Sequence, residues 1–160
     1  MKNKVNLFRL ALLVIVIGVS TAVSAALNPP KQVKILVFFE TKGFYHSSIP
    51  VAVAALQKLG QANNMLVDTT SESATFLQPD LDKYGAIVFM STTGDVFNEA
   101  EQAAFKKYIN NGGGFVGIHA ATDTEYGWPW YNQLVGGYFK SHPKQQEAVL
   151  NIVDGNHKST

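Results

Sequence analysis

Two continuous apolar runs constrain the fold of this chain more than any other feature of its sequence. Residues 34–39 read KILVFF and residues 85–90 read GAIVFM, and polar or glycine-containing turns follow both. A run without polar alternation is typical of a strand buried on both faces, as in a parallel sheet. Helical segments lie between the strands. This order predicts an α/β fold, a doubly wound and mostly parallel sheet with helices on both faces.

The remaining elements continue the alternation. Ser47 or Ser48 is expected to cap the first helix, and Gly60 to end it. Asn98 is expected to cap the second helix, with Glu101 at the capping-box position. Shorter helical segments are expected at residues 71–78 and 128–135, and further strands at residues 65–70, 115–118 and 148–153.

The N-terminus is typical of a secretory signal peptide. Lys2, Lys4 and Arg9 precede an apolar run over residues 10–19, and small residues up to Ala25 fit a signal peptidase site. We therefore expect cleavage after Ala25 and export to the periplasm or the cell exterior. The alternative is a membrane anchor through an uncleaved N-terminal helix, although the run is shorter than the roughly 20 residues that span a bilayer.

The predicted organisation is a signal peptide at residues 1–25, a linker at residues 26–33 and one domain at residues 34–160. Cleavage would leave ten basic and twelve acidic residues and no arginine, because Arg9 is the only one. Arginine supplies bidentate contacts to bases and phosphates. We therefore expect no nucleic-acid partner, and a phosphorylated substrate is disfavoured.

The absence of cysteine excludes disulfides, thiolate zinc sites and cysteine nucleophiles. The glycine run at residues 112–114 precedes a strand instead of opening a helix, so it does not fit a phosphate-binding loop. The sequence thus gives no evidence for a nucleotide cofactor.

The sharpest local feature is the stretch GFVGIHAA at residues 114–121. A short strand runs into a turn of small residues with His119 at its tip, which is the shape of a nucleophile elbow. An imidazole held over the edge of the sheet could act as a general base, a hydrogen-bond donor or a metal ligand. The alternative is a structural histidine that hydrogen-bonds a loop carbonyl.

Two more histidines lie in segments that the topology could bring to the same edge. Ligands of such sheets bind at the carboxyl ends of the strands, where loops begin near Glu40, Ser91 and His119. His46 lies in the first of these loops, and His142 lies in a turn after residues 128–135. Asp123 follows the elbow and could orient His119 or share a proton with it. The predicted catalytic residues are His119, His46, His142 and Asp123, with capping or surface roles as the alternatives.

The segment at residues 128–131 reads WPWY. Flat aromatic faces suit the C–H faces of sugar rings, and indole N–H groups suit hydroxyls. We expect at least one indole to belong to the core and the other to contact a ligand. The predicted substrate-binding residues are Trp128, Trp130, Tyr131 and Glu40.

A metal site without cysteine needs about three ligands from histidine and carboxylate. No candidate pair has the i, i+4 spacing of a helical site, so a divalent metal is weakly indicated and no residue is assigned to one. The candidates are His46, His119, His142 and Asp123.

Three stretches in order resemble the ThuA-like (trehalose utilisation) family of the class I glutamine-amidotransferase-like superfamily. They are FFETKGFYHSSI at residues 38–49, NNGGGFVGIHAATD at residues 110–123 and WPWYNQLVGGYFKSHP at residues 128–143. The resemblance implies a flavodoxin-like core over residues 34–160 and a domain that is incomplete at its C-terminus. Related amidotransferases carry a nucleophilic cysteine at the tip where this chain has His119. The resemblance therefore does not imply cysteine-dependent glutamine hydrolysis.

Three hypotheses about function follow. The first is an exported, sugar-active enzyme domain that acts on trehalose, a related disaccharide or a keto sugar through His119. The second is a non-catalytic carbohydrate-binding or partner-docking module, and the third is a metal-dependent hydrolase. The resemblance implies a small sugar as ligand and sugar-processing modules as fused or associated partners. The sequence identifies no cofactor and no oligomeric state.

Overall fold

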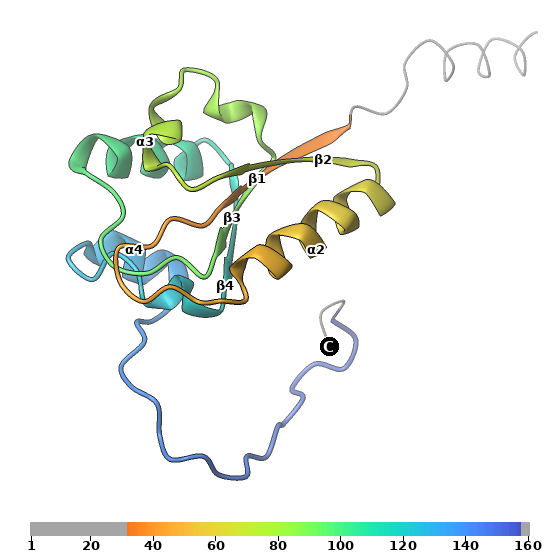
Figure 1. Ribbon diagram of the computed structural model, residues 1–160, viewed down its shortest axis with the longest axis vertical. Helices are drawn as coiled ribbons and strands as arrows, with labels where there is room; N and C mark the ends of the chain where they lie inside the picture. The colour runs from red at the N-terminus through yellow and green to blue at the C-terminus, as the bar shows by residue number, and fades with distance from the viewer. Residues whose placement is uncertain (1–31, 158–160) are drawn as a thin grey trace, which may run out of the picture.

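The structure, a computed structural model, describes residues 32–157 and contains a four-stranded parallel sheet (Figure 1). The strands lie in the order β2-β1-β3-β4, and every neighbouring pair is parallel. This arrangement confirms the predicted α/β class. The strand bounds are β1 (Val33–Phe38), β2 (Met65–Thr70), β3 (Ala86–Met90) and β4 (Gly114–Ile118).

Helices cover both faces of the sheet, which confirms the doubly wound arrangement (Figure 1). The helix α2 (Ile49–Ala62) packs on one face against a small aliphatic cluster. The other face is covered by α3 (Glu99–Asn110), α4 (Pro129–Val135) and the short helix η1 (Ser73–Leu77). Two further short helices are η2 (Leu81–Lys83) and η3 (His119–Thr122).

Within residues 32–157, no helix is long and apolar enough to cross a membrane. The predicted signal peptide, with the membrane anchor that is its alternative, lies outside the described residues. Export therefore remains a prediction.

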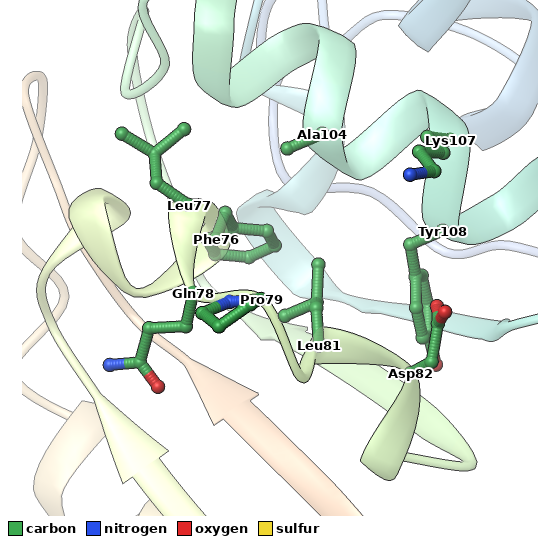
Figure 2. Close-up of a pocket in the computed structure, with 9 residues that line it drawn as sticks. All are labelled: Phe76, Leu77, Gln78, Pro79, Leu81, Asp82, Ala104, Lys107 and Tyr108. Atoms are coloured by element: carbon green, nitrogen blue, oxygen red, sulfur yellow. The ribbon is translucent and has the colours of Figure 1, made fainter.

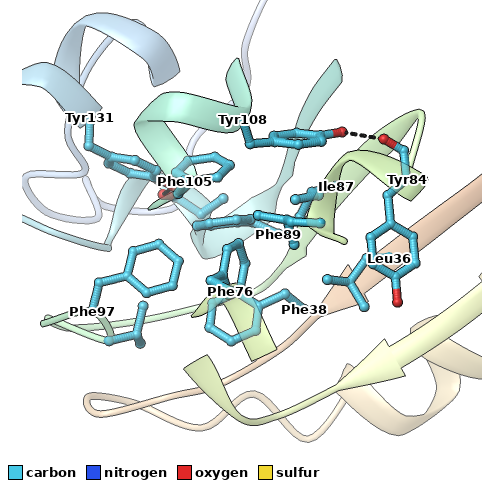
Figure 3. Packing of buried hydrophobic residues seen from close by; sticks show 13 residues of the cluster. Leu36, Phe38, Phe76, Tyr84, Ile87, Phe89, Phe97, Phe105, Tyr108 and Tyr131 are labelled. Carbon is cyan, nitrogen blue, oxygen red and sulfur yellow. Dashed lines mark hydrogen bonds between the residues drawn. The ribbon is translucent and has the colours of Figure 1, made fainter. Parts of the chain in front are cut away.

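The core under α3 consists mainly of aromatic rings (Figure 3). Phe38 and Phe89 come from the two central strands, and their ring centroids lie 5.2 Å apart. Phe105 from α3 stacks on Phe89 at 5.1 Å. Burial of one such side chain contributes roughly 1.5–3 kcal/mol. The cluster therefore fixes α3 relative to β1 and β3, and with it the carboxyl ends of both strands.

Two predicted helix ends have different outcomes. The capping box at the start of α3 is confirmed, because Asn98 Oδ1 accepts from the backbone N–H of Glu101 at 3.0 Å and Glu101 Oε2 accepts from that of Asn98 at 2.8 Å. The predicted end at Gly60 is wrong, since α2 continues to Ala62. A Cβ at position 60 would collide with Cγ2 of Val67 in β2. Glycine is needed there for close packing of helix on strand.

The predicted strand at residues 148–153 is also wrong. Residues 140–157 are exposed and belong to no helix or strand. Val149 is 87% exposed and Val153 is 101% exposed. Apolar β-branched residues favour a strand only where a neighbouring strand accepts their backbone hydrogen bonds, and the described sheet contains four strands without this segment.

Candidate functional site

Hydrogen bonds join the three loops at the carboxyl edge of the sheet. The backbone N–H of Lys42 donates to the Thr93 carbonyl at 2.8 Å, and the Thr93 hydroxyl donates to the Phe44 carbonyl at 2.9 Å. These bonds fasten the loop after β1 to the loop after β3. The N–H of Gly94 donates to the Asp123 carbonyl at 2.8 Å and fastens the loop after β4 in turn. The irregular backbone of the edge is therefore held in a fixed arrangement.

The sharp turn predicted at His119 is present at the end of β4. His119 has a φ of +52°, in the left-handed region, which costs roughly 1–2 kcal/mol for an L-residue. A Cβ at Gly117 would lie 3.1 Å from the Cβ of Ala121, so a small residue is needed for the turn. The neighbouring strand β3 ends in a similar turn, since Ser91 directly after it has a φ of +53°. The N–H of Ser91 donates to the carbonyl of Ile118, the last residue of β4, at 3.2 Å.

Four of the predicted site residues line one cavity of about 310 Å³. The rings of His46 and His119 meet edge to face with centroids 4.6 Å apart. The ring of His142 packs against Phe139 at 4.8 Å. The structure therefore brings the three histidines together with Asp123, while their catalytic roles stay predictions. The full lining is His46, His119, Ala120, Thr122, Asp123, Phe139 and His142.

Two buried polar atoms at this edge have no hydrogen-bond partner among the described residues. They are Nδ1 of His46 and Oγ of Ser91, whose side chain is 1% exposed. Buried polar atoms are nearly always hydrogen-bonded, and exceptions occur at functional sites. Sequence reasoning used Ser91 only as the start of a loop. Its position directly after a buried strand was the signal that could have identified it.

Asp123 has a partner that the sequence did not indicate. The Tyr126 hydroxyl lies 2.6 Å from Asp123 Oδ1 and 2.8 Å from the Phe139 carbonyl oxygen. Partial burial and the adjacent carboxylate raise the pKa of Tyr126 to about 12. The hydroxyl therefore keeps its proton at neutral pH and donates it to these acceptors.

The two indoles lie on the aromatic core and do not line the histidine cavity. Their centroids are 4.8 Å apart, and Trp130 meets Phe105 of α3 at 6.0 Å. The ammonium of Lys106 lies 5.7 Å from the centroid of Trp130. We expected one indole to pack on the core, and both do so. The aromatic side chain that lines the cavity belongs to Phe139.

Tyr131 does not have the exposure that substrate binding requires. Its side chain is 0% exposed, and its hydroxyl donates to the Ala121 carbonyl at 2.7 Å. The prediction that Tyr131 binds substrate is therefore wrong. Instead, Tyr131 holds η3 through this hydrogen bond, two residues after the turn at His119.

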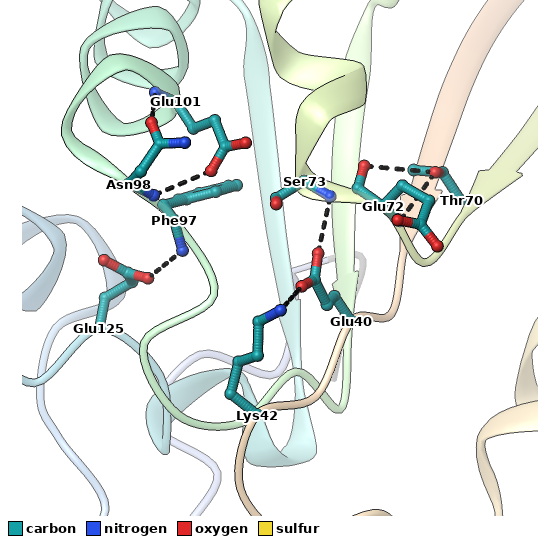
Figure 4. A network of polar contacts seen from close by, with 9 residues as sticks. All are labelled: Glu40, Lys42, Thr70, Glu72, Ser73, Phe97, Asn98, Glu101 and Glu125. Atoms are coloured by element: carbon teal, nitrogen blue, oxygen red, sulfur yellow. Dashed lines mark hydrogen bonds and ion pairs between the residues drawn. The ribbon is translucent and has the colours of Figure 1, made fainter.

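Glu40 is engaged in a structural contact away from the cavity (Figure 4). Its Oε2 accepts from the N–H of Ser73 at 2.6 Å, and its Oε1 forms an ion pair with Lys42. The carboxylate thus ties the end of β1 to η1. This arrangement does not fit the predicted role in substrate binding.

Glu125 is a buried carboxylate in the loop after β4. It is 1% exposed, and one of its oxygens accepts from the N–H of Phe97 at 2.8 Å (Figure 4). The other oxygen accepts from Nε2 of Gln102 at 2.7 Å. Burial raises the pKa of Glu125, and these hydrogen bonds oppose the shift. The side chain anchors the loop after β4 to the start of α3.

A second cavity, of about 240 Å³, lies between α3 and the segment that contains η1 and η2 (Figure 2). Phe76 and Tyr108 form part of its wall, and Asp82 and Lys107 are its charged lining residues. It shares no lining residue with the histidine cavity. The clustered histidines make the first cavity the better candidate for chemistry.

Among residues 32–157, no group of three or more histidine, aspartate or glutamate side chains is arranged to hold a metal ion. The geometry of the described residues therefore offers no ligand set to the metal-dependent hydrolase.

The fold is that of a flavodoxin-like α/β domain, and the cavity lies at the carboxyl edge of its sheet, where such folds bind ligands. The family model of ThuA, described as trehalose utilisation, matches residues 34–160. The chain therefore belongs to the ThuA family.

Comparison with other proteins agrees with this assignment. No curated protein matches the chain. The crystal structure of a ThuA-like protein from Bacteroides uniformis ATCC 8492, at 2.30 Å resolution, is similar, with a TM-score of 0.56 and 27% sequence identity. The match covers 69% of this chain and 46% of that chain, so it spans less than half the length of the solved protein.

Proposed function

We propose that the histidine cavity binds a small carbohydrate and that His119 acts on it as an acid–base group. The observation that carries this proposal is the meeting of His46 and His119 in one cavity, which Asp123 and His142 also line. The family description, trehalose utilisation, supports a sugar as the ligand class.

The size and composition of the cavity support the same ligand class. About 310 Å³ lies at the lower end of the range for small-molecule sites and suits a sugar ring or one end of a disaccharide. Phe139 offers an apolar face for the C–H groups of the ring. The imidazoles and Asp123 offer acceptors and donors for its hydroxyls.

The chemistry assigned to His119 follows from its position. Its side chain is exposed at the cavity and its backbone is held in the left-handed turn. A neutral imidazole has one nitrogen that can accept a proton and one that can donate one. His119 would take a proton from a sugar hydroxyl or give one to a leaving oxygen, and contact with the His46 ring would limit rotation of its own ring.

Calorimetric titration of the full chain with trehalose, sucrose and their 3-keto derivatives tests the proposal. We expect His119→Ala to abolish turnover and Phe139→Ala to weaken binding at least about tenfold, the loss that follows from about 1.4 kcal/mol. Trp130→Ala is the matched aromatic control, because its indole lies outside the cavity. Loss of binding in Trp130→Ala with full binding in Phe139→Ala would contradict the assignment of the cavity.

The same experiment separates the enzyme from the binding module. Binding that survives His119→Ala, with no turnover by the unmodified chain, would favour a non-catalytic carbohydrate-binding module. Absence of binding by the unmodified chain to every sugar would contradict both.

A further inference from the structure

We propose that Tyr126 is a positioning residue that couples ligand binding at Asp123 to the cavity wall that carries Phe139. This inference rests on the proposed sugar site. The hydroxyl of Tyr126 lies within hydrogen-bond distance of Asp123 Oδ1 and of the Phe139 carbonyl oxygen, at 2.6 Å and 2.8 Å. Asp123 and Phe139 both line the cavity, so a single hydroxyl joins two of its walls.

The coupling follows from the chemistry of that hydroxyl. A phenol has one proton, so the bonds to the carboxylate and to the carbonyl compete. A ligand hydroxyl that donates to Asp123 shares the negative charge of this carboxylate and weakens its hydrogen bond with the Tyr126 hydroxyl. The proton then shifts toward the Phe139 carbonyl and strengthens the attachment of that wall.

The wall is built to respond to such a change. Phe139 is joined to the loop after β4 by its N–H, which donates to the Thr122 carbonyl at 2.9 Å. The segment that carries Phe139 begins at Gly136, whose φ is +89°, and Gly137; a Cβ at either position would meet no atom within 4 Å. The two glycines can act as a hinge, and the hydrogen bonds of the Phe139 N–H and carbonyl then fix the position of the segment that carries Phe139. Tyr126 therefore sets how closely Phe139 approaches a ligand.

The ring of Tyr126 has a separate, structural contact. It lies 4.9 Å from the ring of Tyr138, whose hydroxyl lies 2.6 Å from the Glu125 carbonyl oxygen. Phenylalanine at position 126 would keep this ring contact and remove only the hydroxyl. Tyr126→Phe is therefore a clean test, because Tyr126 is 46% exposed and its replacement leaves no buried space.

The experiment measures amide hydrogen exchange at Phe139 in the full chain, with and without trehalose. Without ligand, we expect Tyr126→Phe to exchange about tenfold faster, the effect of losing one hydrogen bond of ordinary strength. In the unmodified chain, trehalose should slow this exchange further. In Tyr126→Phe, that ligand-dependent slowing should be lost and trehalose affinity should fall about tenfold. Tyr45→Phe, at a 54% exposed tyrosine, is the control and should match the unmodified chain.

A merely structural role would speed the exchange of Phe139 equally with and without trehalose, and that result would overturn the coupling. Unchanged exchange in ligand-free Tyr126→Phe would overturn the positioning role altogether. Failure of the unmodified chain to bind trehalose overturns the sugar site instead. The ligand-free comparison then still decides whether Tyr126 holds the wall.

Discussion

Alanine usually gives a more stable folded protein than glycine, but at position 119 we expect the glycine variant to be the more stable one. His119 has a φ of +52° and an exposed side chain. Both substitutions remove the imidazole, but only glycine removes the Cβ that makes the left-handed region unfavourable. A comparison of the two variants therefore measures the strain of the turn separately from the chemistry of the ring.

The magnitude follows from the backbone angle. The left-handed conformation costs an alanine roughly 1–2 kcal/mol. Glycine recovers this but loses about 0.5–1 kcal/mol through the greater freedom of the unfolded chain. We expect His119→Gly to be more stable than His119→Ala by about 0.5–1 kcal/mol, a difference in melting temperature of about 2–5 °C for a domain of this size.

Thermal unfolding followed by circular dichroism gives the comparison. The matched control is position 46, where the backbone does not have a positive φ. There the order should reverse, with His46→Gly less stable than His46→Ala. If alanine equals or exceeds glycine at position 119, then the turn stores no strain and the elbow interpretation fails. Sugar turnover should be absent from both variants at position 119.

Three further variants test other parts of the structure. Burial raises the pKa of Glu125 above its usual 4.5, so the folded state binds this proton more tightly than the unfolded state does. The free energy of unfolding should therefore fall as the pH rises from 4.5 through the folded pKa. Urea titrations at several pH values should show that Glu125→Gln lacks this fall. Gly60→Ala should cost about 1–3 kcal/mol by overpacking, and urea titrations should show most of that cost disappearing in a Val67→Ala background. Tyr131→Phe leaves the Ala121 carbonyl without its buried donor and should lower the free energy of unfolding by about 1–2 kcal/mol; an unchanged urea midpoint would refute this role.

Local patterns predicted most of the sheet because they report local physics. The strands at residues 34–39 and 85–90 were predicted to within a residue or two, since a short continuous apolar run is typical of a strand buried on both faces. The capping box at Asn98 was predicted for the same reason, because its hydrogen bonds span only three residues. The turn at His119 followed from the small residues that it requires.

Distant contacts were not predictable in this way. Whether an aromatic ring faces a ligand or the core depends on what packs against it, and Trp130 meets Phe105, which is 25 positions away in the sequence. Glu40 is held by the backbone of Ser73, which lies 33 positions away. Residue type indicated which chemistry each side chain could perform. It did not indicate which distant residue each side chain contacts in the fold.

The strand at residues 148–153 shows the same limit for the backbone. Its composition favours a strand, but a strand also requires a neighbour. β4 pairs with β3 along one side, and no described strand lies on its other side. A sequence pattern describes the segment alone and does not supply that neighbour.

The register of the sheet explains why the candidate site lies where it does. Met90 pairs with Ile118, so β3 and β4 end at the same level, and the next residue of each, Ser91 or His119, takes a left-handed turn. A buried, unpartnered hydroxyl and an exposed imidazole therefore follow two neighbouring strands at the same edge of the sheet. The position of the candidate site therefore follows from the fold, whereas any reaction there would depend on the side chains at the edge. The register alone places residue 119 at this edge, so the turn does not depend on an imidazole at that position. It also implies that His119→Cys should fold normally, since cysteine tolerates the turn no worse than alanine, and melting of His119→Cys within about 2 °C of His119→Ala would agree with this.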